Sequence, residues 1–235
     1  MAAMKYLSVE GVSKAFGFVP ALSNISFSAD RGETVCFVGE NGAGKSTLLR
    51  CVAALNRPDT GKILISGENV FSSAARRTIW RQIGVLEQEA FYFYEDLTCF
   101  ENLELFANLV GTDDPAQLVL RTLERVGLSQ SRLQSVRDLS GGMRKRLALG
   151  RLLLQAPKLL VLDEPFAHLD DAGEDLLLEV LEEFRGAGVA TVFASHRLEL
   201  ASRISDRVIV LEHGRIVDTA ARGGVSGDGS ERLIQ

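Results

Sequence analysis

The chain has 235 residues, of which 46% are hydrophobic and 24% charged, and these proportions are ordinary for a soluble globular protein. Its length suits one large α/β domain, or one domain with a small appended lobe. The net charge of −5 argues against a protein that mainly binds nucleic acid, because such proteins usually carry a surplus of basic residues.

The sequence shows no pattern typical of membrane insertion, secretion or disulfide bonding. No uninterrupted apolar run approaches the roughly 20 residues that a membrane-spanning helix requires. Residues 1–8 lack the apolar stretch and cleavage site of a signal peptide, so we expect a cytoplasmic protein. Cys36, Cys51 and Cys99 are widely spaced without a C-x-x-C pair, which indicates neither a disulfide framework nor a zinc site.

The N-terminal part of the chain reads as strands joined by turns. Alternating residues predict strands at 6–10 and 22–28, with a turn signal at 17–20 between them. The apolar run 35–38 predicts a third strand, and 62–67 predicts a fourth.

Residues 39–47, here called the phosphate loop, follow the third strand and precede a helix-like run. They read G-E-N-G-A-G-K-S-T, which matches the pattern G-x-x-x-x-G-K-[ST] in the context that the pattern requires. The glycines allow successive N–H groups to point at phosphate oxygens, Lys45 can reach the outer phosphates, and the Ser46 hydroxyl can bind Mg²⁺. A surface turn that matches by chance is the less favoured alternative. The predicted nucleotide-binding residues here are Gly39, Asn41, Gly42, Gly44, Lys45, Ser46 and Thr47.

The middle of the chain becomes helical, with apolar residues at three- and four-residue spacing from 90 to about 137. A new run begins at residues 139–142 and enters another helix, which continues through Gln155. We expect a helical subdomain at approximately 90–156, inserted into a single domain of residues 1–220, and a flexible tail at 221–235.

The remaining strands alternate with helices, which predicts a parallel α/β sheet. Residues 158–162 consist of Lys158 and a continuously apolar run, as in a strand buried on both faces. A helix is expected at 172–185, a strand at 189–194 and a hairpin at 208–217.

Asp163 and Glu164 end the buried strand, at the edge where parallel strands present ligands. Asp163 is predicted to hold Mg²⁺ through water, and Glu164 to polarise the water that attacks the outer phosphate. The alternative is that both carboxylates merely cap the next segment. His196 follows the next strand, where a ring N–H can contact the outer phosphate; the alternative is a structural histidine.

Residues 139–142 (Leu-Ser-Gly-Gly) open a helix and are here called the signature segment. Ser140, Gly141 and Gly142 at a helix N-terminus expose backbone N–H groups to an anion, although this sequence is also typical of a linker. We interpret the basic run that follows as a solvated face. Its members are Arg144, Lys145, Arg146 and Arg151.

Together these motifs resemble the ATP-binding cassette (ABC) ATPases, up to about Thr219. The matching segments are 39–47 as Walker A, Gln88 as the Q-loop, 139–142 as the signature, 159–164 as Walker B, 167–170 as the D-loop and His196 as the switch histidine. Phe16 occupies the position where the family stacks an aromatic ring on adenine; the alternative is a residue of the sheet core.

The resemblance implies an α/β fold of the P-loop NTPase type, with a mostly parallel central sheet, an N-terminal antiparallel β subdomain and an inserted helical subdomain. It implies an ATPase that uses ATP and Mg²⁺, with Ser46, Gln88 and Asp163 at the metal. Two chains would lie head to tail, as a homodimer or heterodimer. Ser140, Gly141 and Gly142 of one chain would complete the other chain's site, and Asp170 would lie near the interface.

The resemblance also implies an integral membrane permease as partner, and a location on the inner face of the cytoplasmic membrane. Residues 91–94, four aromatics after Gln88, lie where the family receives that partner; the alternative is core packing of the helical subdomain. Met143 and the Pro165-Phe166 pair resemble exporter subunits, including the haem-exporter ATPase, so we expect export. The alternative function is a soluble regulatory or assembly ABC ATPase, of the envelope-division or iron–sulfur cluster type.

Overall fold

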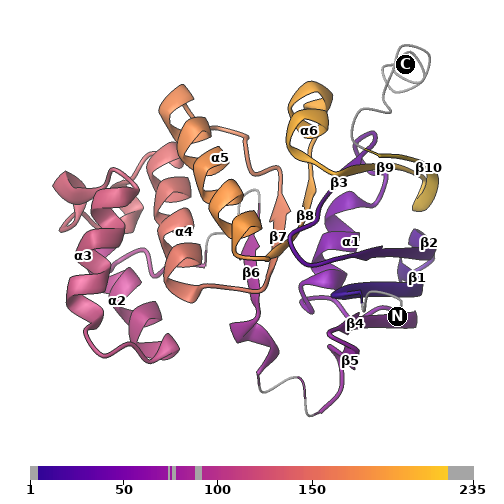
Figure 1. The fold of residues 1–235 in the computed structure, drawn as a ribbon, viewed down its shortest axis with the longest axis horizontal. Helices are drawn as coiled ribbons and strands as arrows, with labels where there is room; N and C mark the ends of the chain where they lie inside the picture. The colour runs from indigo at the N-terminus through magenta and orange to yellow at the C-terminus, as the bar shows by residue number, and fades with distance from the viewer. Residues whose placement is uncertain (1–4, 74, 76–77, 88–91, 222–235) are drawn as a thin grey trace.

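The computed structural model describes residues 5–73, 75, 78–87 and 92–221 (Figure 1). The strands are β1 (Leu7–Phe16), β2 (Val19–Ala29), β3 (Thr34–Val38), β4 (Thr60–Ile65), β5 (Glu68–Asn69), β6 (Ile83–Leu86), β7 (Leu159–Asp163), β8 (Ala190–Ala194), β9 (Arg207–Glu212) and β10 (Arg215–Ala221). The helices are α1 (Lys45–Val52), α2 (Cys99–Val110), α3 (Pro115–Arg125), α4 (Gly141–Gln155), α5 (Asp171–Gly186) and α6 (Leu198–Ile204).

The strands form two sheets. The larger has the order β10-β9-β3-β8-β7-β6, and its pairs are parallel except for the β9–β10 hairpin. Every residue of β3, β7 and β8 is buried, which accounts for their nearly continuous apolar sequences. The smaller sheet, β2-β1-β4-β5, is antiparallel throughout. The expected α/β fold, with a mostly parallel sheet and an N-terminal antiparallel sheet, is confirmed.

Strand β3 divides the hydrophobic core in two because its side chains alternate between the faces of the sheet. Cys36 and Val38 pack with the helices α2 to α5, whereas Val35 and Phe37 pack with α1 and the antiparallel sheet. Phe27 of the smaller sheet meets the Phe37 ring edge-on, with centroids 4.9 Å apart. The phosphate loop therefore leaves a strand that is fixed on both faces.

Helices α2, α3 and α4 lie together at one end of the molecule, beyond β6 (Figure 1). Their ends carry the expected local signals: Thr98 and Glu101 form a capping box at α2, and Asp114 caps α3 ahead of Pro115. The bounds of the helical subdomain at 90–156 stay a prediction. Residue 221 belongs to β10, and the rest of the predicted tail lies outside the described residues.

Within the part of the chain that the structure describes, no helix combines the length and the apolar character needed to cross a membrane.

Candidate active site

The phosphate loop and the predicted catalytic residues follow three neighbouring strands at the same edge of the larger sheet. Strand β8 lies between β3 and β7, and all three are parallel. The segments beyond their ends remain bonded: Glu164 N donates to Ala194 O (3.1 Å), and Ser195 N donates to Phe37 O (3.1 Å). The loop, the two carboxylates and His196 thus start from one edge, where parallel sheets bind ligands.

Three glycines of the phosphate loop adopt backbone angles that residues with side chains rarely take. Their φ values are 148° at Gly39, 83° at Gly42 and 103° at Gly44. A β-carbon on Gly39 would lie 2.1 Å from the carbonyl oxygen of Leu211, and one on Gly44 would lie 2.5 Å from that of Ala21. Glycine is therefore required here by the backbone of the chain itself.

Helix α1 begins inside the loop and directs its N-terminus at the site. Gly44 is the N-cap and provides no side-chain hydrogen bond, so the first N–H groups remain available to an anion. Lys45 is buried, and its Nζ donates to the carbonyl oxygens of Gly39 (2.6 Å) and Glu40 (2.9 Å). Asn41, like Gly42, is exposed, whereas Thr47 is half-buried in the first turn. A buried ammonium beside free backbone donors suits a polyanion such as a triphosphate.

Asp163 and the Ser46 hydroxyl form the oxygen pair expected at a magnesium site. Burial raises the pKa of Asp163, and this effect is opposed by a hydrogen bond with Ser46 and then by the charge of Arg50. A buried carboxylate next to a hydroxyl matches the oxygen ligands that Mg²⁺ prefers. These two residues therefore fit the metal that the family resemblance implies.

Glu164 and His196 meet directly. The His196 Nδ1 and the Glu164 Oε2 are 2.9 Å apart, with the glutamate side chain 13% exposed and the histidine ring 66% exposed. Glu164 has a φ of 46°, an uncommon conformation for a residue with a side chain, and such strain clusters at functional sites. The histidine ring can therefore orient this carboxylate. The two residues predicted for catalysis are thus brought together.

Gln88, predicted at the metal, lies outside the described residues. Just before it lies a buried carboxylate, Glu87, that no sequence pattern indicated. Glu87 is 5% exposed, accepts a hydrogen bond from Arg50 Nε on α1 (2.6 Å) and also accepts one from the Tyr92 hydroxyl. It joins the phosphate-loop helix to the aromatic segment, with partners 37 and 5 residues away. No local pattern signals such a contact, because β6 and α1 meet only in the fold.

Phe16 ends β1 and is 53% exposed, so the alternative of a sheet-core residue does not hold. Lys14 Nζ lies 5.7 Å from the centre of its ring and also pairs with Asp59 (2.8 Å). The adjoining strand β2 runs beside the phosphate loop, as the close approach of Ala21 to Gly44 shows. An exposed ring at this place is available to stack on a base.

Ser140 and Gly141 of the signature segment are exposed and Gly142 is half-buried, whereas Leu139 is buried. The Ser140 Oγ caps α4 by accepting a hydrogen bond from Met143 N (3.2 Å). A β-carbon on Gly141 would meet nothing within 4 Å, and one on Gly142 would lie 3.5 Å from the His168 carbonyl oxygen. The N-terminus of α4 therefore offers open backbone donors.

The D-loop aspartate is anchored to the signature helix. Asp170 caps α5 by accepting from Gly173 N (3.0 Å), and both its oxygens accept from Arg146 Nη2 at 2.7 and 2.9 Å. The Arg146 hydrogen bond is the main cause that lowers the pKa of Asp170. This arginine and the aspartate are both accessible.

The basic run on α4 is not the solvated face that the sequence suggested. Lys145 is 1% exposed, and its Nζ donates to backbone carbonyl oxygens. Arg151 is buried against the rings of Phe93 and Phe106, which themselves meet edge-on, and it donates to Val85 O (2.8 Å). Burial lowers the pKa of Lys145 to about 8 and that of Arg151 to about 10. The prediction failed because both cations find partners from other elements.

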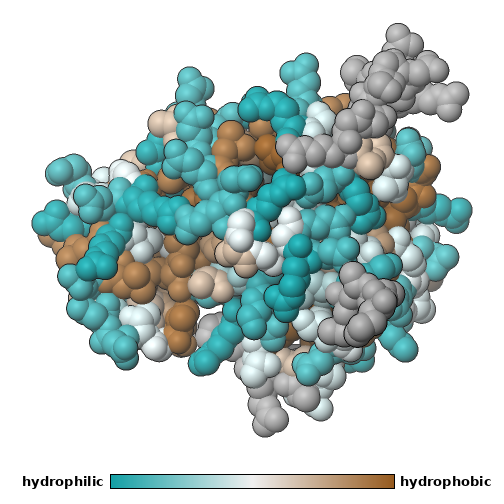
Figure 2. Space-filling view, in the orientation of Figure 1, coloured by the Kyte–Doolittle hydropathy of each residue, from teal (hydrophilic) through white to brown (hydrophobic). Residues whose placement is uncertain are grey.

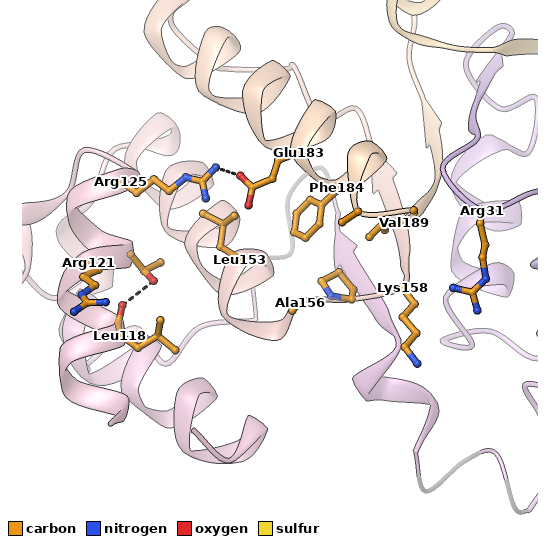
Figure 3. A pocket seen from close by; sticks show the side chains of 14 residues that line it. Arg31, Leu118, Arg121, Arg125, Leu153, Ala156, Lys158, Glu183, Phe184 and Val189 are labelled. Atoms are coloured by element: carbon orange, nitrogen blue, oxygen red, sulfur yellow. Dashed lines mark hydrogen bonds and ion pairs between the residues drawn. The ribbon is translucent and has the colours of Figure 1, made fainter. Parts of the chain in front are cut away.

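A groove of about 550 Å³ lies elsewhere, between α3 and α5 and beside the first residues of β7 and β8 (Figure 3). The Arg125–Glu183 ion pair joins α3 to α5 at this groove. In Figure 2, hydrophobic surface interrupts the hydrophilic face over this helical end of the molecule. The groove is at the opposite ends of β7 and β8 from Asp163 and Ala194, so it is separate from the site. Its apolar lining includes Leu118, Leu153, Phe184 and Val189.

Comparison with known families and proteins agrees with this geometry. Residues 22–167 match the family described as ABC transporter. The chain is 35% identical to the methionine import ATP-binding protein of Cupriavidus necator, over 91% of this chain and 64% of that protein. It is 33% identical to a phosphate import ATP-binding protein of Natronomonas pharaonis, over 94% of this chain and 82% of that protein. The chain thus spans somewhat less than two thirds of the methionine import relative.

Solved structures show the same fold. An ATP-binding subunit of an ABC transporter superimposes with a TM-score of 0.87 at 28% identity, over 98% of this chain and all of that chain. An ATP-binding cassette described as dimeric, in a post-hydrolysis state bound to ADP and Pi, gives a TM-score of 0.84 at 25% identity, over 93% of this chain and 99% of that chain. The fold expected from the resemblance is therefore confirmed.

Proposed function

Because the chain belongs to the ABC transporter family, we propose that it is the subunit that binds and hydrolyses ATP for a membrane transporter. Family membership makes it an ATPase that converts ATP and water to ADP and phosphate, with Mg²⁺ as cofactor. The observation that carries the proposal is the meeting of Glu164 and His196 at the strand edge that also holds the phosphate loop.

Each side chain of this edge has a distinct task. Lys45 and the N-terminus of α1 bind the phosphates, and Phe16 stacks on the adenine. Ser46 and Asp163 hold Mg²⁺, which neutralises phosphate charge when bound. Glu164 accepts the proton of the attacking water, and His196 holds the glutamate carboxylate in place through the 2.9 Å contact.

The signature residues act on the ATP of a partner chain. Ser140 caps the N-terminus of α4, and the backbone at Gly141 is open to the approach of a ligand. In a head-to-tail dimer this N-terminus faces the γ-phosphate held by the partner, and Asp170 lies near the interface. ATP binding closes the dimer, and hydrolysis opens it. A structurally similar cassette is described as dimeric, which supports this arrangement.

A separate permease is the membrane partner, and the aromatic segment after Gln88 is the proposed docking surface. Tyr92 and Tyr94 are 58% and 65% exposed, whereas Phe93 packs edge-on against Phe106. The chain would then lie on the inner face of the cytoplasmic membrane. The docking segment connects to the site, since the Tyr92 hydroxyl donates to Glu87 and Glu87 pairs with Arg50.

Two opposite directions of transport, export and import, are open to this subunit. Met143 and Phe166 favour export, whereas the relatives named above carry import in their names. A transport assay in right-side-out and inverted vesicles distinguishes the two directions.

The alternative of a soluble regulatory or assembly ATPase predicts soluble partners alone. Affinity purification from membranes tests it, because a co-purifying protein with several membrane spans supports the transporter.

The hydrolytic role is tested by Glu164→Gln. We expect ATP binding to persist and a closed dimer to accumulate, while steady-state hydrolysis falls by about 10²- to 10⁴-fold, the usual range for loss of a general base. Glu183→Gln is the matched control, since it removes a carboxylate from an ion pair beside the opposite ends of strands β7 and β8. Undiminished hydrolysis in Glu164→Gln would remove this residue from the role of base.

A further inference from the structure

Lys145 connects the signature helix to the segment that holds the proposed base. It lies on α4 just after the signature segment, and its side chain is buried. Its Nζ donates to the backbone carbonyl oxygens of Glu164 and Ala167, each at 2.8 Å. These charge-assisted hydrogen bonds join two elements that are separated by strand β7 in the sequence.

Burying the Lys145 ammonium group costs desolvation free energy. Burial lowers the pKa of Lys145 to about 8, although the carboxylates of Glu164 and Asp163 oppose the shift. An apolar side chain of similar length would fill the same volume without desolvating a charge. The contact is therefore better explained by where it holds the backbone than by the stability that it adds.

The backbone that Lys145 binds is strained. Glu164 has a φ of 46°, and its carbonyl oxygen also accepts from Ala167 N at 3.1 Å. Such a conformation persists only when the surrounding structure fixes it. By binding both Glu164 O and Ala167 O, Lys145 fixes the turn that directs the Glu164 carboxylate toward His196.

The next residue of the helix makes a second connection to the same segment. Arg146 binds both carboxylate oxygens of Asp170 at 2.7 and 2.9 Å. Residues 145 and 146 thus hold the two ends of segment 164–170, and His168 O lies close to Gly142 between them. The first turns of α4 and this segment are therefore expected to move together.

We propose that Lys145 is a positioning residue that couples the signature segment to Glu164 of its own chain. When the signature segment binds the partner's ATP, Lys145 holds Glu164 in position for hydrolysis. The inference rests on the proposed dimer, in which the signature serves one ATP and Glu164 the other. Each chain then couples the two sites through its own α4. Hydrolysis becomes cooperative because a signature segment that has engaged the partner's ATP holds Glu164 in its working position.

The experiment compares the full-length chain with Lys145→Met, which removes the three donors and keeps an unbranched side chain. Steady-state hydrolysis is measured against ATP concentration. For two coupled sites the Hill coefficient can reach about 2, and we expect the variant to fall to about 1. We also expect kcat to fall by about tenfold, since each lost hydrogen bond to a charged group is worth on that order. ATP affinity of the monomer should change less than about twofold, because Lys145 does not touch the phosphate loop.

Arg144→Met is the matched control on the same helix. Arg144 pairs with Glu95 (3.1 Å) and with the Arg137 carbonyl oxygen (3.0 Å), but not with segment 164–170. Its Hill coefficient should equal that of the unmodified chain. If Lys145→Met fails to fold, Lys145→Gln replaces it, because the shorter side chain reaches at most one of the two carbonyls and should lower the coefficient partway.

Two results would overturn the inference. One is a Lys145 variant whose Hill coefficient is unchanged and whose rate falls only in proportion to its folded fraction, which circular dichroism measures. The other is an unmodified chain that hydrolyses ATP without cooperativity. Failure of the proposed function looks different, since it appears as undiminished hydrolysis in Glu164→Gln.

Discussion

The phosphate loop and the signature segment both place glycines at the start of a helix, yet the fold treats them differently. Gly39 and Gly44 have positive φ, and a β-carbon on either would collide with neighbouring backbone. Gly141 is exposed, and a β-carbon there would meet nothing. The loop glycines are thus required by the chain itself, whereas the signature glycine is free of such a requirement.

This difference indicates where each segment works. A loop that is fixed by Leu211 and Ala21 is a preformed cradle for a ligand of its own chain. A helix N-terminus with an open approach needs its small residues only when something outside the chain comes close. The comparison therefore supports a signature that completes the site of a partner.

The largest expected effects are on ATP hydrolysis and ATP binding, and they distinguish the functions of the two segments. Gly141→Asp should lower hydrolysis by about 10²-fold or more, because a side chain and a negative charge block the donors aimed at the partner's phosphate. Lys45→Ala should abolish ATP binding itself. Equilibrium binding of a fluorescent ATP analogue, with hydrolysis measured in parallel, distinguishes them. Loss of monomer binding in Gly141→Asp would contradict the comparison.

A smaller effect separates the two segments by stability. Gly39→Ala should lower the free energy of unfolding by about 3 kcal/mol or more, since it adds a backbone collision to an unfavourable φ. Gly141→Ala should change it by less than about 0.5 kcal/mol, as for an exposed position. Urea unfolding of both variants provides the measurement. Equal destabilisation would mean that the signature glycine also serves its own fold.

The effect that is smallest per pH unit concerns Lys145, on the helix that the signature begins. Its pKa is about 8 in the folded protein against 10.5 ordinarily, mainly because of burial. Between these values the unfolded chain binds the proton and the folded chain does not, so this residue makes stability rise with pH, by at most about 1.4 kcal/mol per pH unit. Below about pH 8 both states are protonated and its slope vanishes.

Lys145→Met isolates this contribution, because every other titrating group is common to both chains. The difference in unfolding free energy between variant and unmodified chain should change between pH 8 and 10.5, by at most about 1.4 kcal/mol per pH unit. From about pH 6 to 7.5 this difference should stay constant. A constant difference throughout would show that the lysine pKa is ordinary.

Much of the site was predictable because several of its functional residues lie close together in short segments of the sequence. Asp163 and Glu164 follow an apolar strand directly, and a parallel sheet brings such ends to one edge. The sequence could not show that Glu164 contacts His196, 32 residues away, with the ring nitrogen at 2.9 Å. The role of Glu87 could not be predicted for the same reason, since its partner Arg50 lies on another element.

The sequence by itself determined the phosphate loop, because nine consecutive residues contain all the glycines, the lysine and the hydroxyls that a phosphate site needs. Only the tertiary structure decided the state of the basic run on α4. Charge and spacing favoured a solvated face, but Lys145 is buried against carbonyl oxygens from beyond β7, and Arg151 is buried against two aromatic rings. Burial is a property of the packed chain, and local periodicity does not record which distant groups will be there to satisfy a charge.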